Sequence, residues 1–258
     1  MTFAVHRFRF WFALAAILLS SITAYASNSL TACYNAYYIF KVGETCITYT
    51  LNDREELEVE SFARSAGMVN AVRRFTEESR SVLSLDPMQP KSFYQRQSNR
   101  RGSRVHDYIF EGDQVNYTVA RFNTDGSLRR IESDTQDLPG VFEPYSLSLF
   151  IQLTGEQRGE LPLFFGGETG SVEFRERGTS TIEAAGETFR TKRLDIIPKA
   201  RDEDGALSPE GNWRFWIDKE TGLLVQMRIS VAVGSATITL SDMSGNKRLL
   251  ERIKLPPL

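Results

Sequence analysis

Short stretches of alternating apolar and polar residues, rich in aromatic and β-branched side chains, recur along most of this 258-residue chain. Turn-forming residues separate them, as in Asn123-Thr124-Asp125-Gly126. The pattern predicts strands over residues 34–40, 45–51, 57–62, 92–96, 105–110, 115–122, 171–175, 179–184, 188–197, 213–217, 223–231 and 236–240. Strands this short and this closely spaced indicate an antiparallel meander rather than repeated βαβ units.

Two segments depart from the strand pattern. In residues 67–83 apolar residues recur at spacings of three and four, with charged residues between them, which predicts an amphipathic helix that ends before Pro87. Residues 144–153 are mostly apolar and are expected to form a short helix or a buried connector. The expected fold is mainly β: a single antiparallel, strongly curved sheet or open barrel with these two helices. No linker or repeat divides the chain, so residues 27–258 should form one domain.

The first 26 residues have the order of a secretory signal peptide. Basic Arg7 and Arg9 precede an uncharged apolar run over residues 10–19, and Ala24-Tyr25-Ala26 has small residues where a signal peptidase requires them. The run is shorter than the roughly 20 apolar residues that span a membrane. We therefore expect cleavage after Ala26, export of the mature chain, and no stable transmembrane span in it.

Cys33 and Cys46 are the only cysteines, and they flank a predicted hairpin. Export would place them in an oxidising compartment, where a disulfide between the first two strands is expected. Leu30-Thr31-Ala32-Cys33 also has the residue types of a bacterial lipobox, although polar residues separate it from the apolar run. Lipidation of Cys33 would give a membrane-anchored lipoprotein and would exclude the disulfide.

The composition argues against several classes of function. The chain has 31 Lys and Arg against 33 Asp and Glu, which argues against the basic field of a non-specific nucleic-acid-binding protein. Two histidines and two cysteines are too few for a His/Cys-rich metal site. No cofactor motif is present: Gly166 to Gly170 lacks the Lys-Ser/Thr of a phosphate loop and is expected to be an ordinary loop. The acidic residues 201–205 lack the distal Glu of an EF-hand and suit a solvated hairpin loop better than a calcium site.

His106 is the only histidine left after signal cleavage. Any Ser-His-Asp or metal site would have to be built around it, which makes it the best candidate for a hydrolase. Its neighbour Asp107 points to the opposite face of the predicted strand. The expectation is that His106 lies on a solvated face of the sheet.

A basic cluster precedes His106. It consists of Arg96, Arg100, Arg101 and Arg104. These arginines could receive a phosphate or lipid headgroup, or they could form a solvated hairpin tip. The 17 Phe and 9 Tyr likewise leave two interpretations open, core packing or an apolar cavity for a lipid-like ligand.

Several motifs in this order resemble a bacterial exported family of unknown function, DUF3108. They are Tyr34 to Phe40 followed by Lys41-Val42-Gly43-Glu44 as a turn, Met88-Gln89-Pro90-Lys91-Ser92-Phe93, Asp137-Leu138-Pro139 through Tyr145-Ser146-Leu147, and Trp213 to Asp218 with Gly222-Leu223-Leu224-Val225. The resemblance implies a curved, mostly antiparallel β architecture like that of envelope lipoproteins and carriers, and it implies that the exported chain is located in the periplasm. It carries over no catalytic residues. The family's usual Leu-Pro-Val is Leu223-Leu224-Val225 here, and the paired cysteines are not expected of the family.

These observations predict a non-enzymatic periplasmic protein of the cell envelope that binds an apolar or amphiphilic ligand or an envelope partner. A scaffold that acts through surface contacts is the alternative, and a hydrolase built on His106 or the acidic loop is a third. An interior cavity would favour the ligand, and an exposed apolar patch would favour the scaffold.

Overall fold

A single antiparallel sheet contains every strand of the computed structural model, which describes residues 28–72, 74–200, 213–230 and 234–253. The first eight strands are β1 Ser29–Tyr37, β2 Lys41–Leu51, β3 Leu57–Ser65, β4 Phe75–Leu85, β5 Met88–Asn99, β6 Gly102–Glu111, β7 Gln114–Phe122 and β8 Leu128–Asp137. The other six are β9 Arg158–Phe165, β10 Glu168–Ala184, β11 Glu187–Ala200, β12 Trp213–Asp218, β13 Leu224–Ser230 and β14 Ser235–Gly245. The helices are α2 Gly67–Val72, α3 Pro144–Leu153 and the 3₁₀ turn η1 Leu250–Arg252.

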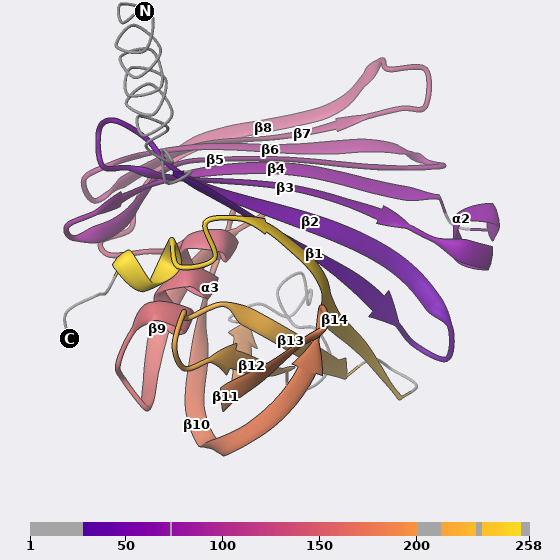
Figure 1. Cartoon of the computed structure of the whole chain (residues 1–258). Coiled ribbons are helices and arrows are strands. Elements are labelled where there is room, and N and C mark those ends of the chain that lie inside the picture. The colour runs from indigo at the N-terminus through magenta and orange to yellow at the C-terminus, as the bar shows by residue number, and fades with distance from the viewer. Residues whose placement is uncertain (1–27, 73, 201–212, 231–233, 254–258) are drawn as a thin grey trace, which may run out of the picture.

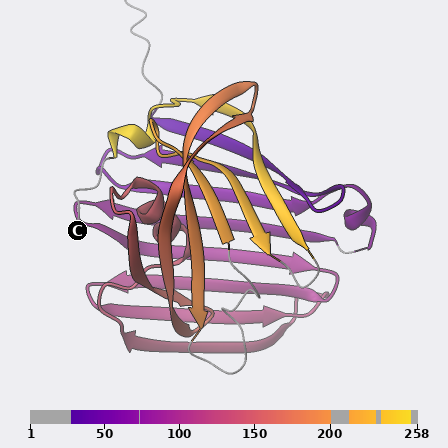
Figure 2. The same cartoon turned by 90° about the horizontal axis from the view of Figure 1, so that it is seen from below.

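The strand order is β8-β7-β6-β5-β4-β3-β2-β1-β14-β13-β12-β11-β10-β9. Two meanders therefore join where β14 pairs with β1, and β8 and β9 form the two ends of the sheet. The sheet curls so that β9–β14 lies below the broad layer β1–β8, with α3 between them (Figures 1 and 2). The prediction of a mainly β, antiparallel, strongly curved and open sheet is confirmed.

The prediction of a helix over residues 67–83 is wrong. The helix α2 ends after six residues, and the chain continues as strand β4, which pairs with β3 and β5. Apolar residues occur at helical spacing here because the buried face of β4 carries the polar residues Glu77, Ser79 and Ser81, which conceal the two-residue period of the strand. Helix α3, by contrast, forms over the predicted residues 144–153.

The first hairpin also differs from its expected form. Residues 38–40 make the turn, and Gly43 lies inside β2, opposite Ala36 of β1. A Cβ atom at Gly43 would lie 3.1 Å from the carbonyl oxygen of Arg64 on β3, so close packing between strands, not turn geometry, favours glycine there.

Cys33 and Cys46 are directly opposite each other in β1 and β2 and are joined by a disulfide, as the hairpin predicted. Their Cα atoms are 4.0 Å apart. The proposed signal peptide and the acidic loop 201–205 lie outside the described residues. Within those residues, no helix is both long and apolar enough to cross a membrane.

The main core lies between the two layers, where α3 packs against both. Phe174 of β10, Ile151 of α3 and Leu30 of β1 are fully buried in it. Complete burial of such a side chain stabilises the fold by about 1.5–3 kcal/mol. Because α3 is held by apolar contacts, it has a fixed position over the inner face of the sheet, the face that β1–β8 turns toward α3 and β9–β10.

Candidate ligand-binding site on the inner face of the sheet

Two rows of polar side chains cross the inner face at right angles to the strands. Residues that are directly opposite in neighbouring strands share one face of a sheet, so the register defines each row. The serine–histidine row is Ser61, Ser79, Gln95 and His106, from β3 to β6. The arginine row is Glu77, Gln97, Arg104, Arg121 and Arg130, from β4 to β8. The serine–histidine row is buried, whereas the arginine row runs from the partly buried Glu77, Gln97 and Arg104 to the exposed Arg121 and Arg130. Buried faces are normally apolar, so the polar residues of the serine–histidine row need an explanation.

Structural elements from distant parts of the sequence cover the serine–histidine row. From the β9–β10 hairpin, Phe165 stacks on the His106 ring with centroids 4.7 Å apart. From α3, the hydroxyl of Tyr145 lies 2.5 Å from that of Ser61. Burial raises the pKa of Tyr145 to about 12. The expectation that His106 lies on a solvated face is wrong, because these covers leave its side chain fully buried.

The turn that carries Phe165 is a two-residue hairpin of Gly166 and Gly167. Both have positive φ, +73° and +92°, which a two-residue hairpin turn of this kind requires and glycine adopts without strain. The expectation of a loop over Gly166 to Gly170 is correct only for these two residues, because strand β10 begins at Glu168. The backbone N–H of Gly166 donates a hydrogen bond of 2.7 Å to the Tyr108 hydroxyl, so the turn is fixed directly to β6.

These contacts determine the protonation of His106. The Tyr108 hydroxyl accepts from Gly166 and lies 2.8 Å from the Nδ1 atom of His106. We assign the hydroxyl proton to this second contact, since the Gly166 N–H is the other partner of the hydroxyl, and this assignment makes Nδ1 the acceptor. Burial, followed by the nearby positive charges of Arg104 and Arg121, lowers the pKa of His106 to about 3. The ring is therefore neutral, and its remaining proton lies on Nε2.

Three buried polar atoms on this face have no hydrogen-bond partner among the described residues. They are Oε1 of Gln95, Nε2 of His106 and Nε of Arg104. The Gln95 and His106 side chains are 5% and 0% exposed. An unpaired buried donor or acceptor costs about 1–3 kcal/mol, so a native fold keeps few of them. Here an acceptor and a donor lie on paired residues of β5 and β6, where a group that both donates and accepts could bind to both.

The arginine row places like charges side by side. Arg104, Arg121 and Arg130 are directly opposite one another in β6, β7 and β8, an arrangement that repels across strands. Within the described part of the chain, neither Arg104 nor Arg121 has a carboxylate at ion-pair distance. Partial burial and the charge of Arg121 lower the pKa of the Arg104 guanidinium. An anion bound between Arg104 and Arg121 would relieve this repulsion.

The structure separates the four arginines of the predicted cluster. Arg104 faces inward, whereas Arg96 is opposite Val105 on the outer face, and Arg100 and Arg101 form the β5–β6 turn.

The sequence pattern did not single out two residues of the site, Arg121 and Gln95. The alternation of β7 could have indicated Arg121, which lies two residues from the buried Val119.

Glu143 fixes α3 above this face. Its buried carboxylate accepts from the Ser81 hydroxyl at 2.7 Å and from the backbone N–H groups of Tyr145 and Ser146 at 2.8 and 2.7 Å. It is the N-cap of α3, in a capping box with Ser146. Burial raises the pKa of Glu143 despite these hydrogen bonds. All of its contacts serve to hold the helix, so its role is structural.

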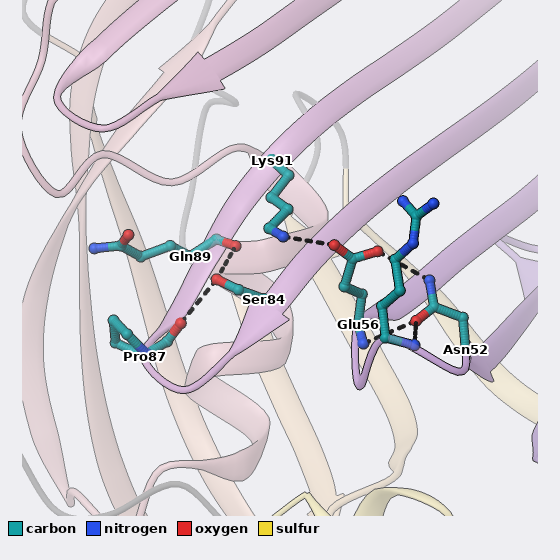
Figure 3. A network of polar contacts seen from close by, with 7 residues as sticks. Asn52, Glu56, Ser84, Pro87, Gln89 and Lys91 are labelled. Carbon is teal, nitrogen blue, oxygen red and sulfur yellow. Dashed lines mark hydrogen bonds and ion pairs between the residues drawn. The ribbon is translucent and has the colours of Figure 1, made fainter.

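A second polar network, at one end of the β1–β8 layer, is also structural (Figure 3). Lys91 bonds to Glu56 at 2.5 Å and Asn52 to Glu56 at 3.0 Å, which links the β2–β3 turn to β5. Ser84 donates to the carbonyl oxygens of Pro87 and Gln89. No buried side-chain atom of these residues lacks a partner in the described region, unlike those of the inner face. Among all the residues that the structure describes, no group of His, Cys, Asp or Glu side chains could hold a metal ion.

The curled open sheet and its covered inner face define a barrel-like β protein. The model of "Protein of unknown function (DUF3108)" matches residues 33–241, and the chain belongs to this family. None of the curated proteins matches the sequence.

Solved structures with this fold include the beta-barrel-like DUF1849 protein from Brucella abortus, 12% identical, with 85% of this chain and 98% of that chain covered and a TM-score of 0.59. The hypothetical lipoprotein YmcC from Escherichia coli is 11% identical over 88% of this chain and 93% of its own, with a TM-score of 0.32. At these identities, the first likeness shows the fold alone.

Proposed function

We propose that the protein is an exported, non-enzymatic protein of the bacterial cell envelope that binds an amphiphilic ligand with an anionic polar group on the inner face. The observation that carries the proposal is the set of unpartnered buried atoms of Gln95, His106 and Arg104. The ligand's anionic group binds between Arg104 and Arg121. A hydroxyl of the ligand pairs with His106 Nε2 and Gln95 Oε1, and its apolar part contacts the aromatic residues around Phe165.

Export is supported by two features of the chain. The N-terminal residues have the order of a signal peptide, and Cys33 and Cys46 form a disulfide of the kind that persists in oxidising compartments.

The proposal excludes catalysis by His106 for chemical reasons. A general base works best with a pKa near the working pH, and the pKa of His106 is about 3. Its Nδ1 atom is engaged by Tyr108, and no serine, cysteine or carboxylate of the described residues is hydrogen-bonded to the ring. This environment suits a fixed neutral donor rather than a proton shuttle.

The experiment is a calorimetric titration of the purified protein with dodecyl phosphate and with dodecyl maltoside, each below its micelle concentration. We expect saturable binding of the phosphate and much weaker binding of the neutral detergent. Arg121→Gln should weaken phosphate binding about tenfold or more, the loss expected for one charge-assisted hydrogen bond. Arg96→Gln is the matched control, because Arg96 is exposed on the outer face of β5. Equal affinity for both detergents, or equal effects of both substitutions, would remove the proposal.

An envelope scaffold is the second candidate, and β8 is the observation that favours it. This edge strand is exposed along nearly its whole length, including the apolar Leu128 and Ile131. Its charged residues, such as Arg129 and Glu132, discourage pairing with another strand, so a partner would contact the side chains of β8 and would not extend the sheet. A stable complex with an envelope protein that is lost on Ile131→Lys, together with no detergent binding, would favour the scaffold over the ligand.

A further inference from the structure

The turn between β1 and β2 exposes four large apolar or aromatic side chains in succession. Tyr37, Tyr38, Ile39 and Phe40 form this segment, here called the aromatic tip. Ile39 is 84% exposed, and the three aromatic side chains are each more than a third exposed. Most large apolar side chains in a soluble domain contribute to its core, so a contiguous exposed group of this kind marks an interaction surface.

Helix α2 extends this apolar surface. The backbone N–H of Ala66, just before α2, donates to the carbonyl oxygen of Val42 in β2 at 2.9 Å, which places the helix beside the base of the aromatic tip. Met68 of α2 is 68% exposed. Figure 1 shows α2 and the β1–β2 turn at the same end of the β1–β8 layer.

This end of the layer is also basic. In an antiparallel meander, alternate turns lie at the same end, so the β3–β4, β5–β6 and β7–β8 connections accompany the aromatic tip. The β7–β8 turn is the farthest of them from the tip, and its one charged residue is the exposed Asp125. The exposed arginines of these connections are Arg74, Arg100 and Arg101. None of the three has a carboxylate partner among the described residues. The acidic residue nearest the tip, Glu44, is paired with both Lys41 and Arg64.

The opposite end of the layer has the opposite charge. The β2–β3, β4–β5 and β6–β7 turns lie there and carry mostly acidic exposed residues. These are Asp53, Glu55, Asp86, Glu111 and Asp113. The layer therefore has a charge asymmetry along its strands, and a negatively charged surface would attract the end with the aromatic tip and repel the other.

We infer that the aromatic tip docks the protein on an anionic phospholipid bilayer. Tyrosine and phenylalanine partition into the headgroup region, and exposed Ile39 and Met68 can enter the edge of the acyl layer. Arg100 donates a hydrogen bond to the backbone oxygen of Ala71, but it has no carboxylate partner among the described residues, as is true of Arg74 and Arg101. Arginines without a carboxylate partner at this end of the layer match the negative surface potential of such a bilayer. A protein partner could cover an apolar tip, but these arginines favour the lipid surface. This inference is independent of the proposed ligand.

The test is co-sedimentation with vesicles of phosphatidylcholine alone and of an equimolar mixture of phosphatidylcholine and phosphatidylglycerol. The protein is purified without detergent in the form that accumulates in the cell, with its N-terminus established by mass spectrometry. We expect binding to the anionic vesicles that salt weakens, and little binding to phosphatidylcholine alone. The double substitution Ile39→Ser and Phe40→Ser should reduce this binding at least tenfold, about the effect of losing two exposed apolar anchors.

Matched variants separate the tip from general effects. Leu128→Ser with Ile131→Ser removes exposed apolar side chains of β8, and it should leave vesicle binding unchanged. Arg101→Glu should weaken binding about tenfold, whereas Arg158→Glu on β9 should not. Circular dichroism shows whether each variant keeps its fold. Absent vesicle binding, equal binding to both vesicles, or equal losses in tip and control variants would overturn the inference, as would an envelope protein that is retained by the tip when vesicles are not.

Discussion

Glu143→Ala offers a sharp test of how α3 is held over the inner face. The substitution removes the N-cap of α3 and the acceptor of the Ser81 hydroxyl, which is fully buried. Loss of an N-cap costs about 1 kcal/mol. The Ser81 hydroxyl left without an acceptor costs about 1–3 kcal/mol more. We therefore expect the free energy of unfolding to fall by about 2–4 kcal/mol.

Urea denaturation followed by tryptophan fluorescence measures this loss, with the slope m checked for constancy. Glu183→Ala is the control, because Glu183 is an exposed carboxylate on β10 and its removal should change stability by no more than about 0.5 kcal/mol. A double-mutant cycle with Ser81→Ala should show a coupling of about 1–3 kcal/mol. If Glu143→Ala is as mild as Glu183→Ala, or the coupling is zero, the anchoring role of Glu143 is refuted.

The same carboxyl predicts a pH dependence. Burial raises the pKa of Glu143 above its unfolded value of 4.5, so the folded state holds the proton more tightly. The contribution of this group to the free energy of unfolding therefore falls as the pH rises from 4.5 through the raised pKa. Glu143→Gln should lack this component, and a comparison of the two pH profiles of stability checks the sign.

Three further predictions follow from other parts of the fold. Replacing Cys33 and Cys46 by serine should lower the free energy of unfolding by about 3 kcal/mol, because the disulfide closes a loop of 13 residues. Urea denaturation of the variant and of the oxidised protein measures the loss, and an unchanged urea midpoint would contradict it. The pKa of His106 is about 3 in the folded protein against 6.5 when unfolded, so the contribution of His106 to the free energy of unfolding is fully present above pH 6.5. This contribution is lost as the pH falls toward 3, by up to about 1.4 kcal/mol per pH unit. His106→Gln should flatten the pH profile of stability, and a profile of equal steepness would count against this prediction. Gly159→Ala should lower the free energy of unfolding by about 1–3 kcal/mol, since the added Cβ atom would lie 2.7 Å from the buried ring of Phe174. Adding Phe174→Leu should reduce this loss, and an equal loss in the Phe174→Leu background would show that the clash is not its source.

The sequence predicts strands well where one face of the strand is apolar. Strands β1, β5 and β7 show an alternation of residue types that matches their burial. Strand β4 could not be recognised this way, because its inner face at Glu77, Ser79 and Ser81 is polar. Strand β8 has no signal because it lies at the sheet edge with both faces exposed.

The candidate site was harder to predict than the fold. Arg104 was singled out as basic, but the sequence does not show that Arg121 lies directly opposite it. The burial of His106 depends on Phe165 and on the contact between Gly166 and Tyr108, which are 58 residues apart. Such long-range contacts are fixed by how the sheet curls, and local residue patterns contain no information about that curvature.

The nitrogen NMR signal of His106, recorded with and without dodecyl phosphate, tests whether this ligand binds at the inner face. The chain has two histidines, and the other, His6, lies in the expected signal peptide. We expect a neutral ring protonated at Nε2 down to about pH 4, whose Nε2 resonance moves on addition of dodecyl phosphate but not of dodecyl maltoside. A resonance that titrates near pH 6.5, or one that does not respond to dodecyl phosphate at concentrations where the compound binds, would contradict this expectation.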